Sequence, residues 1–221
     1  MLARTTSFRC TVLSIFVLFC SVFAVKGADG DGFVSLFNGK NLDGWVLNGK
    51  PEGWEVKEGL LRSEGGKGGN WIRSEKEYGD YIFKTDWKVS KGGNSGIFIR
   101  AADKGNPWQT GYEVQIYTGE RDDLHCTGSL YGYAAVNPRP DETPDKWHTL
   151  EIQCVGPKIK IVADGVKVVD VDQTELPLPK EEGYPDPKTK PTRGYIGIQD
   201  SHSDAGHYIE FRNIRIKELG K

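Results

Sequence analysis

The sequence predicts an all-β fold, a jelly-roll sandwich of two antiparallel sheets, and three observations support this prediction. Apolar and polar residues alternate with a period of two in segments throughout the 221 residues, a pattern typical of half-buried strands. The 28 glycines and 11 prolines supply frequent turns, and helical periodicity is nearly absent. Short strands between closely spaced turns indicate a sandwich or barrel, and we expect one of the two sheets to be concave.

The predicted elements are short and follow one another closely along the chain. Asp164-Gly165 lies between two alternating runs and is the strongest hairpin signal in the sequence. A short turn at 172–175 is the only helical feature that we expect. We interpret the proline-rich segment 176–191 as a long loop within one domain. In chain order, the clearest predicted strands are 81–89, 150–154, 159–163, 166–171, 195–199 and 208–216.

The N-terminal segment 1–28 is predicted to be a signal peptide. Basic residues precede an apolar run at 11–25, and small residues follow it, which is the order of a secretory signal. An uncleaved membrane anchor and lipidation at Cys20 are the competing interpretations. The run is short for a full membrane span, and Phe19 stands where a lipidation signal needs a small residue. We therefore expect an exported protein, periplasmic or extracellular, whose mature domain (29–221) leaves the membrane after cleavage.

Charge and cysteine content limit the partners and the covalent structure. The formal net charge of −2 does not predict a nucleic-acid partner. The mature domain retains Cys126 and Cys154, which permit one disulfide in an exported protein. Cys154 alternates with Leu150 and Ile152 in a predicted strand, and this pattern favours a buried thiol instead.

Two neighbouring predicted strands, which end at Arg100 and Tyr117, carry polar groups that a purely structural sheet would not need. In the second strand, apolar residues alternate with Glu113, Gln115 and Tyr117, so one face is apolar and the other is polar. If the strands pair, a carboxylate, an amide, a phenol and a guanidinium share one sheet face. That combination is typical of a sugar-binding surface.

Motifs along the whole mature chain resemble the 3-keto-disaccharide hydrolase family, in order and at family-like spacing. The resemblance implies a concanavalin-A-like jelly roll and an exported enzyme that cleaves 3-keto-glycosides. Characterised members eliminate across C1–C2 of a 3-keto-glucoside and then add water to the resulting 2-hydroxyglucal. The motifs are FVSLFNGKNLDGW (33–45), WEVKEGLL (54–61), YGDY (78–81), GNSGIFIR (93–100), GYEVQI (111–116), TGSLYG (127–132), GYIGIQD (194–200) and FRNIRI (211–216).

The carboxylate pattern distinguishes this chemistry from ordinary glycoside hydrolysis. A retaining glucanase of this fold needs paired carboxylates in a Glu-x-Asp-x-x-Glu arrangement, whereas here Gln115 follows Glu113 at the second position. Elimination needs one base for the acidic C2 proton and an electropositive group for the enolate oxygen. Under this hypothesis Glu113 is the base and Arg100 the carbonyl partner, and either His125 or His202 supplies the acid.

The remaining candidate residues would bind the substrate, a small molecule or an oligosaccharide. We expect amide and phenol groups to hydrogen-bond sugar hydroxyls, and aromatic rings, above all Trp108, to stack on sugar faces. A non-catalytic glycan-binding module on the same fold is the alternative to an enzyme. The candidate substrate-binding residues are Trp108, Gln115, Tyr117, Tyr131, Gln199 and Asp200.

No organic cofactor is expected, because oxidation of the sugar is the task of a separate dehydrogenase. Four histidines without tight ligand spacing do not predict a zinc site. Acidic loops at 29–31, 122–123 and 200–204 offer oxygen ligands of the kind that calcium prefers. Calcium is thus the one metal that the sequence leaves open.

Overall fold

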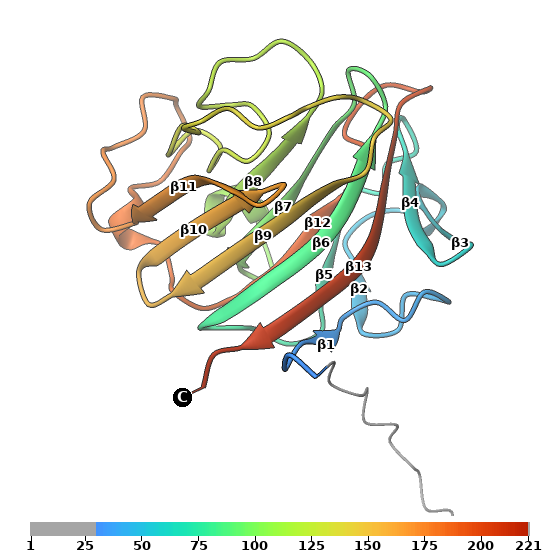
Figure 1. Ribbon diagram of the computed structural model, residues 1–221, viewed down its shortest axis with the longest axis horizontal. Helices are drawn as coiled ribbons and strands as arrows, with labels where there is room; N and C mark the ends of the chain where they lie inside the picture. Colours follow the sequence, from blue (N-terminus) through green and yellow to red (C-terminus); the bar gives the residue numbers. More distant parts are fainter. Residues whose placement is uncertain (1–29, 221) are drawn as a thin grey trace, which may run out of the picture.

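The computed structural model describes residues 30–220, which form two antiparallel sheets packed face to face (Figure 1). This architecture confirms the predicted all-β jelly roll. The predicted signal peptide (1–28) lies outside the described residues. Among residues 30–220, no helix has the length and apolar character needed to cross a membrane.

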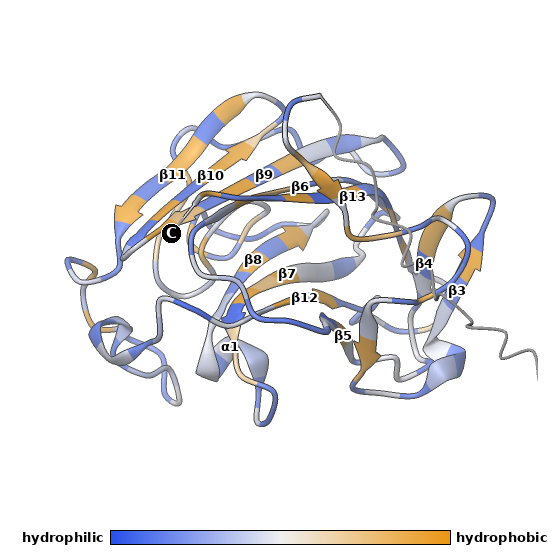
Figure 2. Ribbon diagram, turned by 90° about the horizontal axis from the view of Figure 1, so that it is seen from below, coloured by the Kyte–Doolittle hydropathy of each residue, from blue (hydrophilic) through white to orange (hydrophobic). Residues whose placement is uncertain are grey.

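The larger sheet has eight strands in the order β11-β10-β9-β6-β13-β4-β3, with β1 pairing to β13. Buried and more exposed positions alternate along β9 and β10. In β11 a bulge leaves the adjacent residues Val168 and Val169 both buried, and the hydropathy colouring shows apolar and polar bands on these strands (Figure 2). The strands are β1 (Val34–Ser35), β3 (Trp54–Lys57), β4 (Leu60–Glu64), β6 (Tyr81–Val89), β9 (His148–Val155), β10 (Lys158–Ala163), β11 (Val166–Asp172) and β13 (Tyr208–Glu218).

The smaller sheet has five strands in the order β2-β5-β12-β7-β8. Segment 127–134 folds back along β8, where Val114 bridges Leu130. Three single-turn helices, α1 (Pro107–Thr110), η1 (Pro51–Gly53) and η2 (Pro187–Thr189), lie in the connections. The strands are β2 (Trp45–Leu47), β5 (Trp71–Ser74), β7 (Asn94–Ala101), β8 (Tyr112–Tyr117) and β12 (Tyr195–Gln199).

The core lies between the inner faces of the two sheets. Every second residue of β6, from Tyr81 to Val89, is buried, which confirms the predicted face. Tyr112, Val114 and Ile116 of β8 are each 0% exposed and belong to the same core cluster. The polar side chains that alternate with them on β8 are therefore directed to the outer face of the smaller sheet.

Turns and thiols follow the sequence predictions closely. Asp164 and Gly165 have φ of 47° and 80° and join β10 to β11 as the predicted two-residue hairpin. The turn at 172–175 closes with a hydrogen bond of 3.0 Å from the Glu175 amide to the Asp172 carbonyl. Cys126 and Cys154 are buried free thiols, so the buried-thiol interpretation is confirmed and the disulfide alternative is wrong.

Candidate functional site

The pairing of β7 with β8 creates the polar floor that the sequence predicted. Glu113 lies opposite Phe98, and Gln115 lies opposite Gly96. A Cβ atom at position 96 would stand 2.5 Å from Glu113 Oε1 and 2.9 Å from its Cγ. The absence of a side chain at Gly96 therefore gives the Glu113 carboxyl the space to lie across β7.

Glu113 is a buried carboxyl group without a compensating bond. Its side chain is 9% exposed, and within residues 30–220 the carboxyl makes no hydrogen bond and no ion pair. Burial raises the pKa of Glu113 from its ordinary value of 4.5 to about 8, and the nearby Arg121 guanidinium opposes this rise. Such a group exchanges protons near neutral pH, as a catalytic base or acid must.

Arg121 is the cation that lies close to Glu113. Its guanidinium stands 4.1 Å from the ring centre of Tyr117, and it donates a 3.2 Å hydrogen bond to the Tyr131 hydroxyl. The Tyr131 amide in turn donates to the Glu113 carbonyl at 2.9 Å. Two predicted substrate residues, Tyr117 and Tyr131, thus hold Arg121 beside the candidate base.

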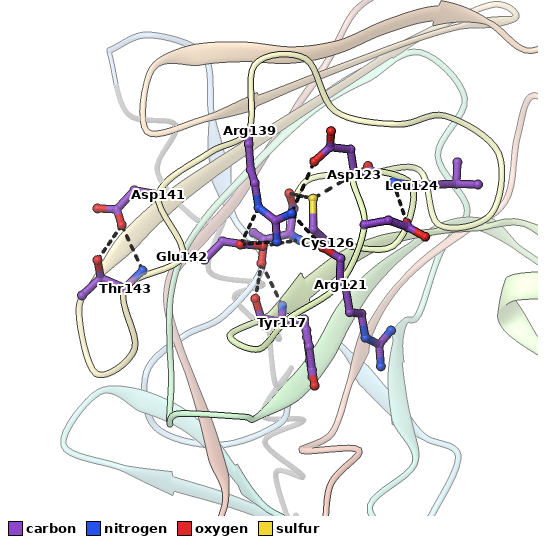
Figure 3. A network of polar contacts seen from close by, with 11 residues as sticks. Tyr117, Arg121, Asp123, Leu124, Cys126, Arg139, Asp141, Glu142 and Thr143 are labelled. Carbon is purple, nitrogen blue, oxygen red and sulfur yellow. Dashed lines mark hydrogen bonds and ion pairs between the residues drawn. The ribbon is translucent and has the colours of Figure 1, made fainter.

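Arg139 braces the loop that carries Arg121 (Figure 3). It donates to the Arg121 carbonyl at 2.8 Å and forms two hydrogen bonds with Glu142 Oε2, at 3.0 and 2.8 Å. Glu142 Oε1 accepts a 2.9 Å hydrogen bond from the Thr127 amide. One ion pair therefore holds both ends of segment 121–127 in place.

Arg100 does not share the face of Glu113, and this corrects the sequence prediction. Its backbone has a φ of 58°, and the register of β7 against β12 shifts beside it. Such a bulge rotates the side chain to the opposite face. The Arg100 guanidinium is 0% exposed and donates to Gln173 and, at 2.6 Å, to the Gly156 carbonyl inside the sandwich.

The two candidate acids have different surroundings. His125 Nδ1 lies 2.7 Å from Asp122 Oδ1, and its Nε2 lies 2.5 Å from Glu181 Oε1, so carboxylates engage both ring nitrogens. The His202 side chain is exposed and, within the described residues, its ring nitrogens have no hydrogen-bond partner. Of the two candidate histidines, His202 is therefore the one whose ring is open to a ligand.

A hollow that we call the Trp108 pocket includes Phe98, the cross-strand neighbour of Glu113, in its lining and has a volume of about 510 Å³. The rings of Trp71 and Phe98 meet edge to face with centres 5.6 Å apart on its floor. Gly197 makes room for them, because a Cβ there would stand 2.6 Å from the Trp71 ring. The pocket is lined by Asn48, Asn70, Trp71, Phe98, 103–108, Gln199 and His202.

Three further predicted substrate residues differ in how far a ligand can reach them. Gln199 lines the Trp108 pocket, and its Oε1 is buried without a hydrogen-bond partner among the described residues. Gln115 is 2% exposed, and its backbone forms hydrogen bonds with Gly128 and Ser129. Asp200 Oδ2 accepts a 2.8 Å hydrogen bond from the Asn70 amide, burial raises the Asp200 pKa, and its Oδ1 has no partner within residues 30–220.

Sequence patterns did not identify Tyr184, which closes the site from the proline-rich loop. Its ring centre lies 4.8 Å from that of Trp108 and 6.4 Å from that of Tyr131. Lys190 ties this loop to α1, because its ammonium donates to the Trp108 carbonyl at 2.9 Å and to the Gly111 carbonyl. Only a signal for loop packing could have found these residues, and a single sequence contains none.

Within residues 30–220, three metal-ligand side chains, Asp141, His148 and Asp164, have one ligand atom each within 4.8 Å of one another, close enough to share one ion. Internal contacts already use these groups. His148 Nδ1 lies 2.7 Å from Asp164 Oδ2, and its Nε2 lies 2.9 Å from the Thr143 carbonyl. Lys146 donates to Asp141 at 2.6 Å. This cluster lies outside the three acidic loops considered for calcium, and its geometry is explained without an ion.

Comparison with known proteins adds a sequence relationship to this geometry. A family model described as the 3-keto-alpha-glucoside-1,2-lyase-like domain matches residues 32–217. The chain is also similar to a curated protein of Bacteroides thetaiotaomicron named 3-keto-disaccharide hydrolase. The two are 26% identical over an alignment of 245 positions, gaps included, which covers 86% of this chain and 80% of that protein.

Solved structures show the same relationship at the level of the fold. A crystal structure of a Parabacteroides distasonis protein, named as a glycosyl hydrolase, is 27% identical with a TM-score of 0.71 and covers 85% of this chain and 99% of that chain. Carbohydrate binding module CBM66 from Bacillus subtilis is 16% identical with a TM-score of 0.50, covers 79% of this chain and 96% of its own, and shares the fold alone. Because the family match spans most of the sequence, this chain belongs to the 3-keto-alpha-glucoside-1,2-lyase-like domain family.

Proposed function

We propose that this protein is an exported carbohydrate enzyme that cleaves 3-keto-glycosides by elimination and hydration, with Glu113 as the base. The observation that carries the proposal is the buried Glu113 carboxyl, whose pKa of about 8 suits proton transfer near neutral pH. Family membership supplies the substrate class, since the Bacteroides relative is named 3-keto-disaccharide hydrolase.

The ketone at C3 makes the C2 proton acidic, and the Glu113 carboxylate takes it. The electrons of the C2–H bond form an enediolate, whose C3 oxygen lies against the Arg121 guanidinium. The C3 carbonyl then re-forms, a C1=C2 double bond appears, and the C1–O bond breaks with its electrons on the leaving oxygen, which takes up a proton. Water next adds through its oxygen to C1, and a proton returns to C2, so the sum of both steps is hydrolysis.

Arg121 takes the role that the sequence suggested for Arg100. Arg100 is enclosed in the core by Gln173 and backbone carbonyls, whereas Arg121 acts electrostatically on Glu113. The proton for the leaving oxygen comes from His202, because both ring nitrogens of His125 are engaged by carboxylates. In the proposed mechanism His125 positions Tyr131, whose ring centre lies 4.7 Å away.

Turnover of matched oxidised and unoxidised sugars tests this function. The mature protein should release glucose from a 3-keto-disaccharide and leave the unoxidised parent disaccharide intact, because only the ketone acidifies C2. Glu113→Gln should lose about 10²-fold or more in kcat while retaining most of its affinity for the sugar. Cleavage of the parent disaccharide would instead indicate an ordinary glycosidase, and binding without any turnover would indicate a glycan-binding module.

The proposed chemistry needs no organic cofactor, because proton transfer and one cation are sufficient for both steps. Export is the second part of the proposal, and it rests on the signal-like segment 1–28. Expression of the full chain in a Gram-negative host tests it: mass spectrometry of the protein from the periplasm or medium should find an N-terminus near residue 29. A cytoplasmic protein that begins at Met1 would contradict export.

A further inference from the structure

Glu113 lies between Phe98 and Tyr131, which line two hollows of different chemistry. On one side Phe98, its cross-strand neighbour, forms part of the Trp108 pocket. On the other side Tyr131, which donates to the Glu113 carbonyl, lines a second hollow together with Arg121 and the Asp122–His125–Glu181 cluster. Tyr184 contacts the aromatic rings of both sides. The candidate base thus has a pocket with three aromatic rings on one side and, on the other side, Arg121, the cation that acts on its charge.

The carbon skeleton of the substrate determines which part of it faces each hollow. In a 3-keto-glycoside C2 is bonded to C1 and C3, which therefore lie on opposite sides of the proton that the base removes. If the C3 oxygen faces Arg121, C1 and its leaving group face the opposite side of Glu113. We propose that the leaving group occupies the Trp108 pocket, an inference that rests on the proposed function and goes beyond it by assigning the aglycone site.

The groups of the Trp108 pocket fit a second sugar ring as the leaving group. Trp108 is partly exposed and offers apolar ring surface above the buried rings of Trp71 and Phe98, and the C–H face of a pyranose stacks on such a ring. Gln199 Oε1 is a buried acceptor without a partner within residues 30–220, and an unmet acceptor of this kind favours a ligand hydroxyl over an apolar group. His202 lines the same pocket, so the proposed acid is placed on the side of the leaving oxygen.

Three substrates that differ in their leaving group distinguish effects on aglycone binding from effects on the chemical steps. A 3-keto-disaccharide has a sugar aglycone, 3-keto-glucosyl fluoride has a single-atom leaving group, and 2-hydroxy-3-keto-glucal has no leaving group and tests hydration alone. Trp108→Ala should lower kcat/KM for the disaccharide by about tenfold or more. The same variant should change fluoride release and glucal hydration by no more than about threefold.

Two further variants make the result specific. Gln199→Leu removes the unpartnered acceptor without creating a cavity, so it should reproduce the selective loss if Trp108→Ala folds poorly. Trp147→Ala is the control, since Trp147 lies beside Lys88 and Arg212 of the larger sheet and should leave all three rates unchanged. Circular dichroism confirms that each variant is folded before its rates are compared.

The outcomes distinguish this inference from the proposed function. Selective loss on the disaccharide supports the aglycone site. An equal loss on all three substrates in Trp108→Ala and Gln199→Leu would show that the pocket holds the keto-sugar itself and would overturn the inference, while the proposed function stands. If the wild-type protein turns over none of the three substrates, the proposed function fails and the aglycone site fails with it.

Discussion

At the level of single residues, the proposed activity depends on the Glu113 carboxyl group, which is buried but makes no hydrogen bond or ion pair within residues 30–220. Burial keeps Glu113 protonated up to about pH 8, whereas Arg121 favours its ionised form. The reactive form of the base is the carboxylate, so its population rises as the pH passes through the pKa.

The pH dependence of activity follows directly from this balance. We expect kcat/KM for a 3-keto-glucoside to rise with pH along a limb whose midpoint lies near pH 8 and to level off above it. Arg121→Gln should move that limb to higher pH, because it removes the cation that lowers the Glu113 pKa. Arg193→Gln, which removes an exposed ion pair with Glu77, is the control and should leave the limb in place. If the limb is unchanged in Arg121→Gln, Arg121 does not influence the pKa of Glu113, and the proposed pairing of the two residues is wrong.

Glu113 also makes the free energy of unfolding depend on pH. Its pKa rises from 4.5 to about 8 on folding, so between these values the unfolded chain releases a proton that the folded protein retains. This contribution to stability is therefore complete below about pH 4.5 and is lost as the pH rises to about 8. At pH 8.5 urea unfolding should find Glu113→Gln more stable than the wild type by roughly 3–5 kcal/mol, and the difference should shrink towards pH 5. A difference that does not change with pH would contradict the raised pKa.

At the scale of elements, the close approach of β7 and β8 determines where the carboxyl lies. Gly96→Ala places a Cβ 2.5 Å from Glu113 Oε1, so the carboxyl must move while both strands remain paired. We expect kcat to fall by about tenfold or more, since small misplacements of a catalytic group are costly. Gly220→Ala, where a Cβ meets nothing within 4 Å, is the control. Full activity of Gly96→Ala would show that the carboxyl position is not critical.

The connection between β8 and β9 forms the second element of the site. Arg139 holds the Arg121 carbonyl at 2.8 Å (Figure 3) but does not contact Glu113. Arg139→Gln should therefore act through Arg121 and move the pH limb in the same direction as Arg121→Gln. The double variant should show no further shift, because both changes disrupt one interaction. Additive shifts in kcat/KM profiles would mean that Arg139 acts on the site independently.

At the scale of the whole molecule, alternation along strands predicted most of the fold and the polar face of β8. Glu113 and Gln115 occupy that face because period-two alternation survives wherever a strand is regular. The alternation fails at Arg100, where a β-bulge with a positive φ turns the side chain into the core. Side-chain patterns do not encode such a change in backbone conformation.

Loop residues escape sequence prediction for a different reason. Glu181, which binds His125, lies 56 positions further along the chain, and only the folded sandwich brings the two loops together. Tyr184 and Arg121 reach the site in the same way. Alternation along a regular strand therefore predicted the shared face of Glu113 and Gln115, whereas the contacts that Arg121, Glu181 and Tyr184 make between loops required the structure.

The most direct test of the central claim is the position of deuterium in the product. Wild-type protein and Glu113→Gln are incubated with a 3-keto-disaccharide in D₂O, and the released keto-sugar is examined by NMR, beside a protein-free sample of 3-keto-glucose that measures spontaneous exchange. Elimination through Glu113 predicts deuterium at C2 of the wild-type product above the spontaneous level, and almost no product from the variant. Release of a keto-sugar that retains its original hydrogen at C2 would show direct hydrolysis and would contradict the account.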